Sequence, residues 1–434
     1  MDNGVFTRAE SLNSAQEARN NDIRTIAACS IGNALEVYDF TVYSFFAVLI
    51  GKLFFPSSNA YGSLMLAVAT FGIGFILRPL GAFVIGSYAD RRGRKRAMTL
   101  TISVMVAGTL CIACAPTYES VGIAGPLIVL AGRMLQGFSL GGEIGPSTSL
   151  LMEAGEVQSR GFRISWQAAS QGMAALLGAL SGAVLYATLS PDSIEAWGWR
   201  IPFLLGLLIA PVGLYIRSQL DETHNPERYD LSPIRTLFSQ HFGSLIKGVL
   251  AITAGTVGTY VVVFFMPTYM IRVLHMPPSL SLLSGCVSGA TMLIVSLIAG
   301  RLTDRLVLRK PLIQTALVLT AAATYPAYEL VNHSPSLFLV LAMTSLLTAL
   351  LYVVAIPVLV LLTEILPSSV RASGLSIMCS IAVMAFGGSA QYVVTWLLAK
   401  TGNPMAPAFY LIASCVVAFI AVSTIRESKH YRPA

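Results

Sequence analysis

Runs of about 20 apolar residues follow one another from end to end of this 434-residue chain. A helix of that length spans the hydrocarbon core of a bilayer, because each residue adds about 1.5 Å. Apolar residues make up 55% of the chain and charged residues 11%, which is about half the charged share of a soluble domain. The sequence therefore predicts an all-α polytopic membrane protein whose surroundings are the lipid bilayer.

Turn residues divide the apolar runs into twelve predicted transmembrane helices. Their expected ranges are 24–51, 61–88, 97–115, 122–152, 160–188, 199–218, 243–274, 279–304, 311–330, 335–364, 369–400 and 405–425. Twelve spans leave both termini on one side of the membrane. The expected divisions are an N-terminal tail (1–23), an N-terminal six-helix bundle (24–218), a linker (219–242), a C-terminal six-helix bundle (243–425) and a C-terminal tail (426–434).

Two sequence patterns occur twice, separated each time by nearly half of the chain. The charged stretch Gly86–Arg96 returns in degraded form at Gly300–Lys310, and Glu153-x6-Arg160 returns as Glu364-x6-Arg371. Two repeats at almost one spacing indicate a duplicated half, which is the usual construction of secondary transporters.

The 28 lysines and arginines are distributed unevenly over the predicted loops. Only Lys52, Arg200, Arg272 and Lys400 fall in the loops opposite the N-terminus. Cytoplasmic loops carry the excess of positive charge in membrane proteins, so both tails and the linker are predicted to be cytoplasmic. Short basic clusters beside apolar runs also account for the net charge of +7, so no nucleic-acid partner is expected.

Neither the cysteines nor the histidines form a pattern that would hold a metal or a cofactor. All six cysteines fall inside apolar runs, and the five histidines lie in loops, helix ends or the tail. Cys111-x-x-Cys114 has the spacing of a redox motif, but a structural role is favoured in a lipid-embedded helix. The chain is therefore not expected to be an enzyme. A membrane sensor is the other class considered, but it would need a soluble output domain, which the sequence does not contain.

Five charged residues lie inside predicted spans toward the bilayer centre rather than at the span ends, and a charge there costs roughly 3 kcal/mol on insertion scales. They are Glu36, Asp39, Arg78, Arg133 and Glu143. Asp39 and Arg133 are expected at overlapping depths of the membrane. A carboxylate that faces an arginine stays ionised and takes up a proton when that partner is drawn away. The pair is therefore predicted to couple transport to protons, with a static ion pair that fixes helix packing as the alternative.

Two further acids complete the expected proton-coupling set. Glu36 lies three residues before Asp39 on nearly the same helix face, so the two carboxylates can share one coupled site. Glu143 stands among small residues that let a neighbouring helix approach closely. It either pairs with Arg78 or hydrogen-bonds across that helix contact.

The charged patterns on the predicted cytoplasmic face indicate a gate. Asp90 is expected to face the first turn of another helix or the loop at Arg160, and such contacts would form and break as the transporter changes state. The positive charges also serve as topology signals. The expected gate residues are Gly86, Asp90, Arg91, Gly93, Arg94, Glu153, Arg160, Asp304, Glu364 and Arg371.

Polar side chains at mid-span are the candidates for substrate binding. They are Asn33, Tyr38, Tyr43, Arg78, Arg133, Gln167, Gln171, Tyr260, Tyr269, Tyr352 and Gln391. Gln167 and Gln171 lie one turn apart on one helix face. For each single residue, hydrogen bonding between helices is an equal alternative to ligand contact.

Several of these motifs resemble those of known transporters. Gly86–Lys95 resembles the cytoplasmic signature of the major facilitator superfamily, and Arg133-x-x-Gln136-Gly137 resembles its fourth-helix arginine motif. The stretches that look like the metabolite:proton symporter family run in order along nearly the whole chain: Gly32–Phe40, Leu77–Gly81, Gly141–Glu143 and Trp197–Phe203.

Within that family, three stretches are most similar to citrate and tricarballylate proton symporters: Ser165–Gln171, Thr363–Arg371 and Phe386–Gly388. Val37 departs from the Trp or Gln of many members, which leaves the substrate open. By this resemblance Asp39 and Arg133 take the places of the proton-coupling pair. The intracellular gate is carried over to Asp90, Arg94, Glu153 and Arg160.

The resemblance implies the major facilitator fold and a symporter of the bacterial inner membrane that couples the import of a small organic acid to protons. Citrate or another tricarboxylate is the foremost substrate expected. A dicarboxylate, shikimate, or a zwitterion such as proline or betaine is the alternative. No cofactor is expected besides the coupling protons, and nothing in the sequence calls for more than a monomer.

Overall fold

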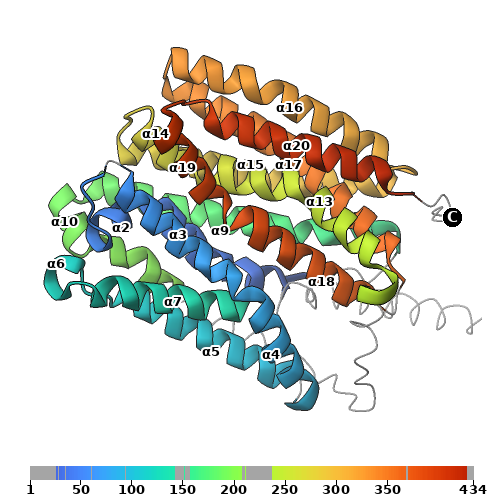
Figure 1. The fold of residues 1–434 in the computed structure, drawn as a ribbon, viewed down its shortest axis with the longest axis horizontal. Helices are drawn as coiled ribbons and strands as arrows, with labels where there is room; N and C mark the ends of the chain where they lie inside the picture. Colours follow the sequence, from blue (N-terminus) through green and yellow to red (C-terminus); the bar gives the residue numbers. More distant parts are fainter. Residues whose placement is uncertain are drawn as a thin grey trace, which may run out of the picture.

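The computed structural model describes a bundle of long helices that run side by side (Figure 1). The described residues are 26–27, 29–34, 36–59, 61–92, 94–141, 151, 157–207, 211, 237–367 and 370–427. Side chains are not described at positions 86, 87, 89–92, 94, 95, 97, 98, 157, 371 and 372. All regular structure in the described part of the chain is helical.

The first half of the chain supplies the blue-to-green helices of Figure 1. A helix at Cys29–Phe45 precedes them and meets α2 at a bend of 65°. Its further elements are α2 (Ala47–Phe54), α3 (Gly62–Ile76), α4 (Arg78–Arg92), α5 (Arg94–Ala113), α6 (Tyr118–Val121), α7 (Ala124–Leu140), the 3-10 turn η1 (Val157–Ser159), α9 (Arg160–Thr188), α10 (Pro191–Ala196) and the 3-10 turn η2 (Gly198–Arg200).

The second half supplies the yellow-to-red helices (Figure 1). Its elements are α13 (Phe242–Gly258), η3 (Thr259–Phe264), α14 (Met266–Arg272), α15 (Pro278–Arg305), α16 (Lys310–His333), α17 (Leu337–Ile365), α18 (Arg371–Ala382), η4 (Val383–Gly387), α19 (Ala390–Thr401) and α20 (Ala406–Thr424). Here η3 and η4 are π-helical.

Seven helices in the described residues are long and apolar enough to cross a membrane, and the bent pair that ends in α2 makes up to eight. Besides the bent first span, the spans predicted at 61–88, 243–274 and 369–400 are interrupted in ways that the apolar pattern did not indicate, the last of them by η4. The helix predicted at 61–88 breaks at Leu77, between α3 and α4. The helix predicted at 243–274 contains the π segment η3 and restarts as α14, where Pro267 occupies the first turn.

The buried apolar side chains form two large groups, and the predicted linker largely separates the two groups in the sequence. One consists mainly of residues between 38 and 203, and the other mainly of residues between 237 and 425. Trp199 anchors the first group, because its ring is fully buried against Phe54 and Phe203. Each half therefore has its own core, which allows the halves to move as units. Of the predicted linker (219–242), residues 219–236 lie outside the described residues.

The two halves meet most closely along α9 and α15, where glycines bring the backbones together. A Cβ placed at Gly172 would lie 2.8 Å from the carbonyl oxygen of Gly289. A Cβ placed at Gly289 would lie 2.8 Å from the carbonyl oxygen of Gly172. Gly161 and Gly300 form a second such pair toward one end. Close backbone approach of this kind needs small residues, so the glycines define a seam between the halves.

Candidate functional site

A cavity of about 170 Å³ lies between the two halves, near the middle of the bundle. Its walls come from the helix Cys29–Phe45, α4 and α9 on one side and from α13, η3, α17 and η4 on the other. Six of the eleven residues predicted to bind substrate line it: Asn33, Arg78, Gln167, Gln171, Tyr260 and Tyr352. The fold thus gathers side chains that are far apart in the sequence.

Amide side chains form the first wall of the cavity. Nδ2 of Asn33 donates to the backbone oxygen of Gln167 at 2.9 Å and to Oγ of Ser170 at 2.7 Å. Nε2 of Gln167 donates back to Oδ1 of Asn33 at 3.0 Å, which fixes both amides. Oε1 of Gln167 is buried without a hydrogen-bond partner among the described residues. A buried acceptor of this kind favours a ligand that brings a hydroxyl or another donor.

Arg78 supplies the cation of the cavity. It is 6% exposed, and its guanidinium carbon lies 4.5 Å from the ring centre of Phe75. Its Nε has no hydrogen-bond partner in the described part of the chain. Glu36 and Tyr260 lie close enough to interact with it electrostatically. An arginine held by aromatic rings, with a donor left over, is well suited to bind a carboxylate.

The opposite wall is aromatic and includes both π segments. Tyr260 belongs to η3, and its ring packs edge-on against Phe75 at 5.4 Å between centroids. The hydroxyl of Tyr352 shares a 2.9 Å hydrogen bond with Oγ1 of Thr259. Val383, the first residue of η4, also lines the cavity. π segments inside helices occur frequently at functional sites, and here two of them border the same space.

Asp39 lies buried beside this cavity and is connected to Arg133 through two intervening side chains. Arg133 Nη1 donates to Oε1 of Gln136 at 2.6 Å, and Nε2 of Gln136 donates to Oγ1 of Thr109 at 2.9 Å. The hydroxyl of Thr109 then donates to Oδ2 of Asp39. Asp39 and Arg133 are 3% and 0% exposed. We call these four residues the relay; it takes the place of a direct ion pair in the described structure.

The relay leaves one carboxylate oxygen available. Oδ1 of Asp39 is buried with no hydrogen-bond partner among the described residues. Position 206 faces it, and a Cβ there would collide with this oxygen, so only glycine leaves the space free. An unpartnered carboxylate oxygen with room beside it is a suitable place for a proton to bind.

Phe40 separates the relay from the cavity. Its ring centre lies 3.9 Å from the guanidinium carbon of Arg133 and 5.5 Å from that of Arg78. Phe40 lines the cavity, whereas Arg133 does not. Tyr43 and Phe71 complete the aromatic surroundings of Arg133, at 4.6 and 5.0 Å. A charged group that enters the cavity beside Arg78 therefore interacts electrostatically with Arg133 across the ring of Phe40.

The remaining residues that the sequence singled out lie outside the cavity lining. Tyr43 donates to the backbone oxygen of Ala67, and Gln391 donates to Ser44 and so joins the two halves. The hydroxyls of Tyr38 and Ser181 lie 3.5 Å apart. The hydroxyl of Tyr269 donates to Oδ1 of Asn332 and to the backbone oxygen of Pro404. Glu36 is buried, with 6% of its surface exposed. Glu143 lies outside the described residues.

A family model of the Major Facilitator Superfamily matches residues 29–378. The chain belongs to this superfamily. It is therefore a multi-pass transporter and not an enzyme, and its fold is the superfamily's twelve helices in two six-helix halves. The fold class predicted from the sequence is confirmed.

The transporter is similar along most of its length to curated relatives. It is 35% identical over 404 residues to a citrate-proton symporter of Klebsiella pneumoniae, covering 92% of this chain and 90% of that one. It is 30% identical over 420 residues to a proline/betaine transporter of Salmonella typhimurium, covering 93% and 83%. Among solved structures, a D-xylose-proton symporter matches with a TM-score of 0.78 at 18% identity, over 95% of this chain and all of that one.

At one end of the transporter, Asp304 closes the seam between the halves. Its carboxylate accepts hydrogen bonds from the backbone N–H groups of Gly161, at 2.6 Å, and Phe162, at 2.9 Å. These groups belong to the first turn of α9, where backbone donors have no partner within the helix and the helix dipole favours negative charge. A carboxylate of the second half thus caps a helix of the first half. We call this contact the Asp304 cap.

Two other carboxylates at the same end, Glu364 and Glu427, form their hydrogen bonds within the second half. Glu364 pairs with Arg309 at 2.5 Å, and Glu427 accepts from the N–H of Arg309, just before α16. Arg160 is close enough to Glu364 to interact electrostatically. Of the other expected gate residues, Gly93 and Glu153 lie outside the described residues, and no side chain is described for Gly86, Asp90, Arg91, Arg94 or Arg371.

Asp304→Ala is expected to loosen this end of the transporter. Loss of a helix cap costs about 0.5–2 kcal/mol, so openings at the seam should become roughly 2- to 30-fold more frequent. The measurement is the labelling rate of a cysteine at the fully buried position Ser165. Asp192→Ala at the other end serves as the control. Equal labelling of the Asp304 variant and the parent would show that the cap does not hold the halves together.

Thr109, Gln136 and Gly206 were not predicted as site residues. Thr109 appears as an ordinary polar residue in an apolar run, and Gly206 as one glycine of many. Gln136 follows Arg133 by three positions, which places both on one helix face, so spacing alone could have indicated their contact. That Thr109 stands between Gln136 and Asp39 depends on the packing of α5 against α7, which the sequence does not show.

Proposed function

We propose that this transporter is a proton-coupled symporter that imports a small organic acid, with citrate or another tricarboxylate as the foremost substrate. The observation that carries the proposal is the position of Arg78. It brings a buried cation into a central cavity and lies one aromatic ring away from the relay that holds a buried carboxylate.

The chemistry of the cavity supports an anionic substrate. Arg78 can bind a carboxylate through charge-assisted hydrogen bonds, and the amides of Gln167 and Gln171 add polar partners. Oε1 of Gln167 offers an acceptor to a substrate hydroxyl. At about 170 Å³ the cavity is smaller than the ~300–1,000 Å³ of sites for drug-sized ligands, which suits a small metabolite. The similarity to a citrate-proton symporter points to the same class.

The relay provides the route for coupling. Through Gln136 and Thr109, Arg133 helps to keep Asp39 ionised. A substrate carboxylate beside Arg78 attracts Arg133 as well, across Phe40, and weakens its hold on the relay. Asp39 then takes up a proton at its free oxygen. Proton entry helps an anion move against an inside-negative potential, which opposes each charge by about 2.3 kcal/mol per 100 mV.

The two ends of the molecule differ as alternating access requires. A pocket of about 870 Å³ opens at the end that contains α2 and α14, whereas the Asp304 cap closes the other end. We assign the open end to the outside of the bacterial inner membrane and both termini to the cytoplasm. Substrate enters from the open end, and loss of the Asp304 cap lets the halves part on the cytoplasmic side.

Uptake by purified protein in proteoliposomes tests the proposal. With the inside more alkaline than the outside, radiolabelled citrate should accumulate, an uncoupler should abolish the accumulation, and excess tricarballylate should compete. Competition by α-ketoglutarate, without competition by tricarballylate, would indicate that the substrate is a dicarboxylate. Uptake of citrate that is unchanged by the uncoupler would contradict proton coupling, and the absence of any citrate uptake would contradict the substrate class.

A zwitterionic substrate is the second candidate, and the aromatic wall favours it. Tyr260, Tyr352 and Phe264 of the second half line the cavity, and aromatic faces bind quaternary ammonium groups. The similarity to a proline/betaine transporter agrees with this arrangement. Competition by proline or betaine in the same uptake experiment, without competition by tricarballylate, would select this candidate.

A further inference from the structure

The open end of the transporter contains a second cavity that is separate from the central one. Its volume is about 870 Å³, and it shares no lining residue with the central cavity. Phe45 lines this outer space and Phe264 lines the central one, and their rings touch edge to face with centroids 6.2 Å apart. We call the larger space the vestibule. This aromatic pair thus has one ring in each of the two linings.

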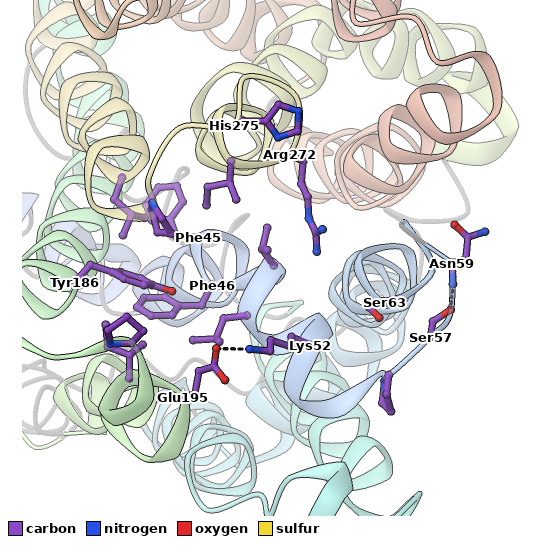
Figure 2. Close-up of a pocket in the computed structure, with 18 of the residues that line it drawn as sticks. Phe45, Phe46, Lys52, Ser57, Asn59, Ser63, Tyr186, Glu195, Arg272 and His275 are labelled. Carbon is purple, nitrogen blue, oxygen red and sulfur yellow. Dashed lines mark hydrogen bonds and ion pairs between the residues drawn. The ribbon is translucent and has the colours of Figure 1, made fainter.

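Arg272 is the cation of the vestibule that has no carboxylate partner among the described residues. It ends α14, and Figure 2 shows its side chain extending from that helix into the pocket. Its Nε is buried without a hydrogen-bond partner among the described residues. No ion pair with Arg272 occurs in the described part of the chain. A guanidinium in this position has donors available for an anion.

A second cation faces it across the vestibule. Lys52 of α2 pairs with Glu195 of α10 (Figure 2). Glu195 is the only carboxylate among the described residues that line the vestibule. The pair is well exposed, with 62% of the Lys52 side chain and 38% of the Glu195 side chain accessible. Exposed pairs of this kind exchange partners easily, because their net stability is small. Lys52 is therefore available to a ligand that displaces Glu195.

We propose that the vestibule is an entry site for multivalent carboxylate anions, held by Arg272 and Lys52 before they pass Phe45 and Phe264. This inference rests on the proposed function, since it takes the substrate to be such an anion. One carboxylate binds the guanidinium of Arg272, and a second binds the ammonium of Lys52 in competition with Glu195. The excess of positive charge in a walled space raises the local concentration of the anion and so its rate of entry.

Transport kinetics test the site through two variants with opposite effects. Arg272→Gln should raise KM for citrate about three- to tenfold at low ionic strength, leave kcat unchanged, and flatten the dependence of kcat/KM on salt. Glu195→Gln should lower KM, because it frees Lys52. Lys400→Gln is the matched control, since Lys400 lies over Trp396 and does not line the vestibule.

A chemical readout keeps the test independent of the transported substrate. A cysteine at the exposed vestibule position Ser58, in a Cys114→Ala background, should react faster with an anionic methanethiosulfonate than with a cationic one. Arg272→Gln should reduce that preference severalfold, and citrate should slow the labelling.

The outcomes separate the two proposals. Normal citrate transport with an unchanged KM, salt dependence and labelling preference in Arg272→Gln would overturn the entry site and leave the proposed function standing. Anion-selective labelling that citrate slows, in a protein that does not transport citrate, would support the vestibule site and overturn the proposed substrate. Labelling that citrate does not slow, together with an absence of citrate transport, would overturn both.

Discussion

Asp39→Asn is expected to abolish proton-driven accumulation while it spares exchange of substrate across the membrane. Asparagine keeps the size of the side chain and can still accept from Thr109, so the relay and the fold should remain. It cannot take up a proton at the free oxygen beside Gly206. Each pH unit across the membrane is worth about a tenfold accumulation per coupled proton, and the variant should lose all of it.

The measurement compares two assays on the same proteoliposomes: uptake driven by an imposed pH gradient, and counterflow of labelled against unlabelled citrate. Asp192→Asn is the matched control, because that carboxylate is exposed in α10. Gradient-driven accumulation that survives in Asp39→Asn would remove this residue from proton coupling. Loss of counterflow along with accumulation would show that Asp39 is needed for the conformational change itself.

Arg78→Gln is expected to weaken binding of an acidic substrate by about 30-fold or more. Removal of one partner from a buried, charge-assisted contact costs about 2–5 kcal/mol, and each 1.4 kcal/mol is a factor of ten in affinity. Glutamine retains donors but loses the charge and the contact with the rings of Phe40 and Phe75. The affinity of Arg78→Lys for the acidic substrate should fall between that of the parent and that of Arg78→Gln, because lysine keeps the charge but loses the planar guanidinium fork.

Equilibrium binding of citrate to the detergent-solubilised protein, followed by calorimetry, measures this effect. Lys247→Gln provides the control, because Lys247 is an exposed cation on α13 that does not line the cavity. An affinity for citrate within a factor of two of the parent would exclude Arg78 as the carboxylate ligand. It would also favour a substrate without net charge, which has less need of a cation.

The fold could be predicted from the sequence because the bilayer imposes one length on every span. A run of about 20 apolar residues has few alternatives to a crossing helix, and charges are so costly there that Asp39, Arg78 and Arg133 stood out at once. The two repeated patterns indicated the duplicated half because charged residues are rare in a chain of this kind. Each is a charged loop that interrupts apolar sequence.

The arrangement of the site could not be predicted, because it depends on contacts between helices. Depth along two spans placed Asp39 near Arg133, but it did not reveal that Thr109 and Gln136 stand between them. The repeat of the charged pattern indicated a gate, yet only the structure shows that Asp304 caps α9 of the other half. Apolar periodicity likewise does not distinguish a π turn from an α turn, so η3 and η4 were missed.

The two π segments bear on how substrate range can change during evolution. A π turn holds one residue more than an α turn, as a one-residue insertion would leave it. Deletion of one residue from η3 would restore the α-helix and shift the residues on one side of the deletion by about 100° around its axis. The deletion would change which residues of η3, among them Tyr260 and Phe264, face the cavity, while Pro267 stays in the first turn of α14. A lineage of such transporters can therefore exchange the wall of its binding site through a single codon loss.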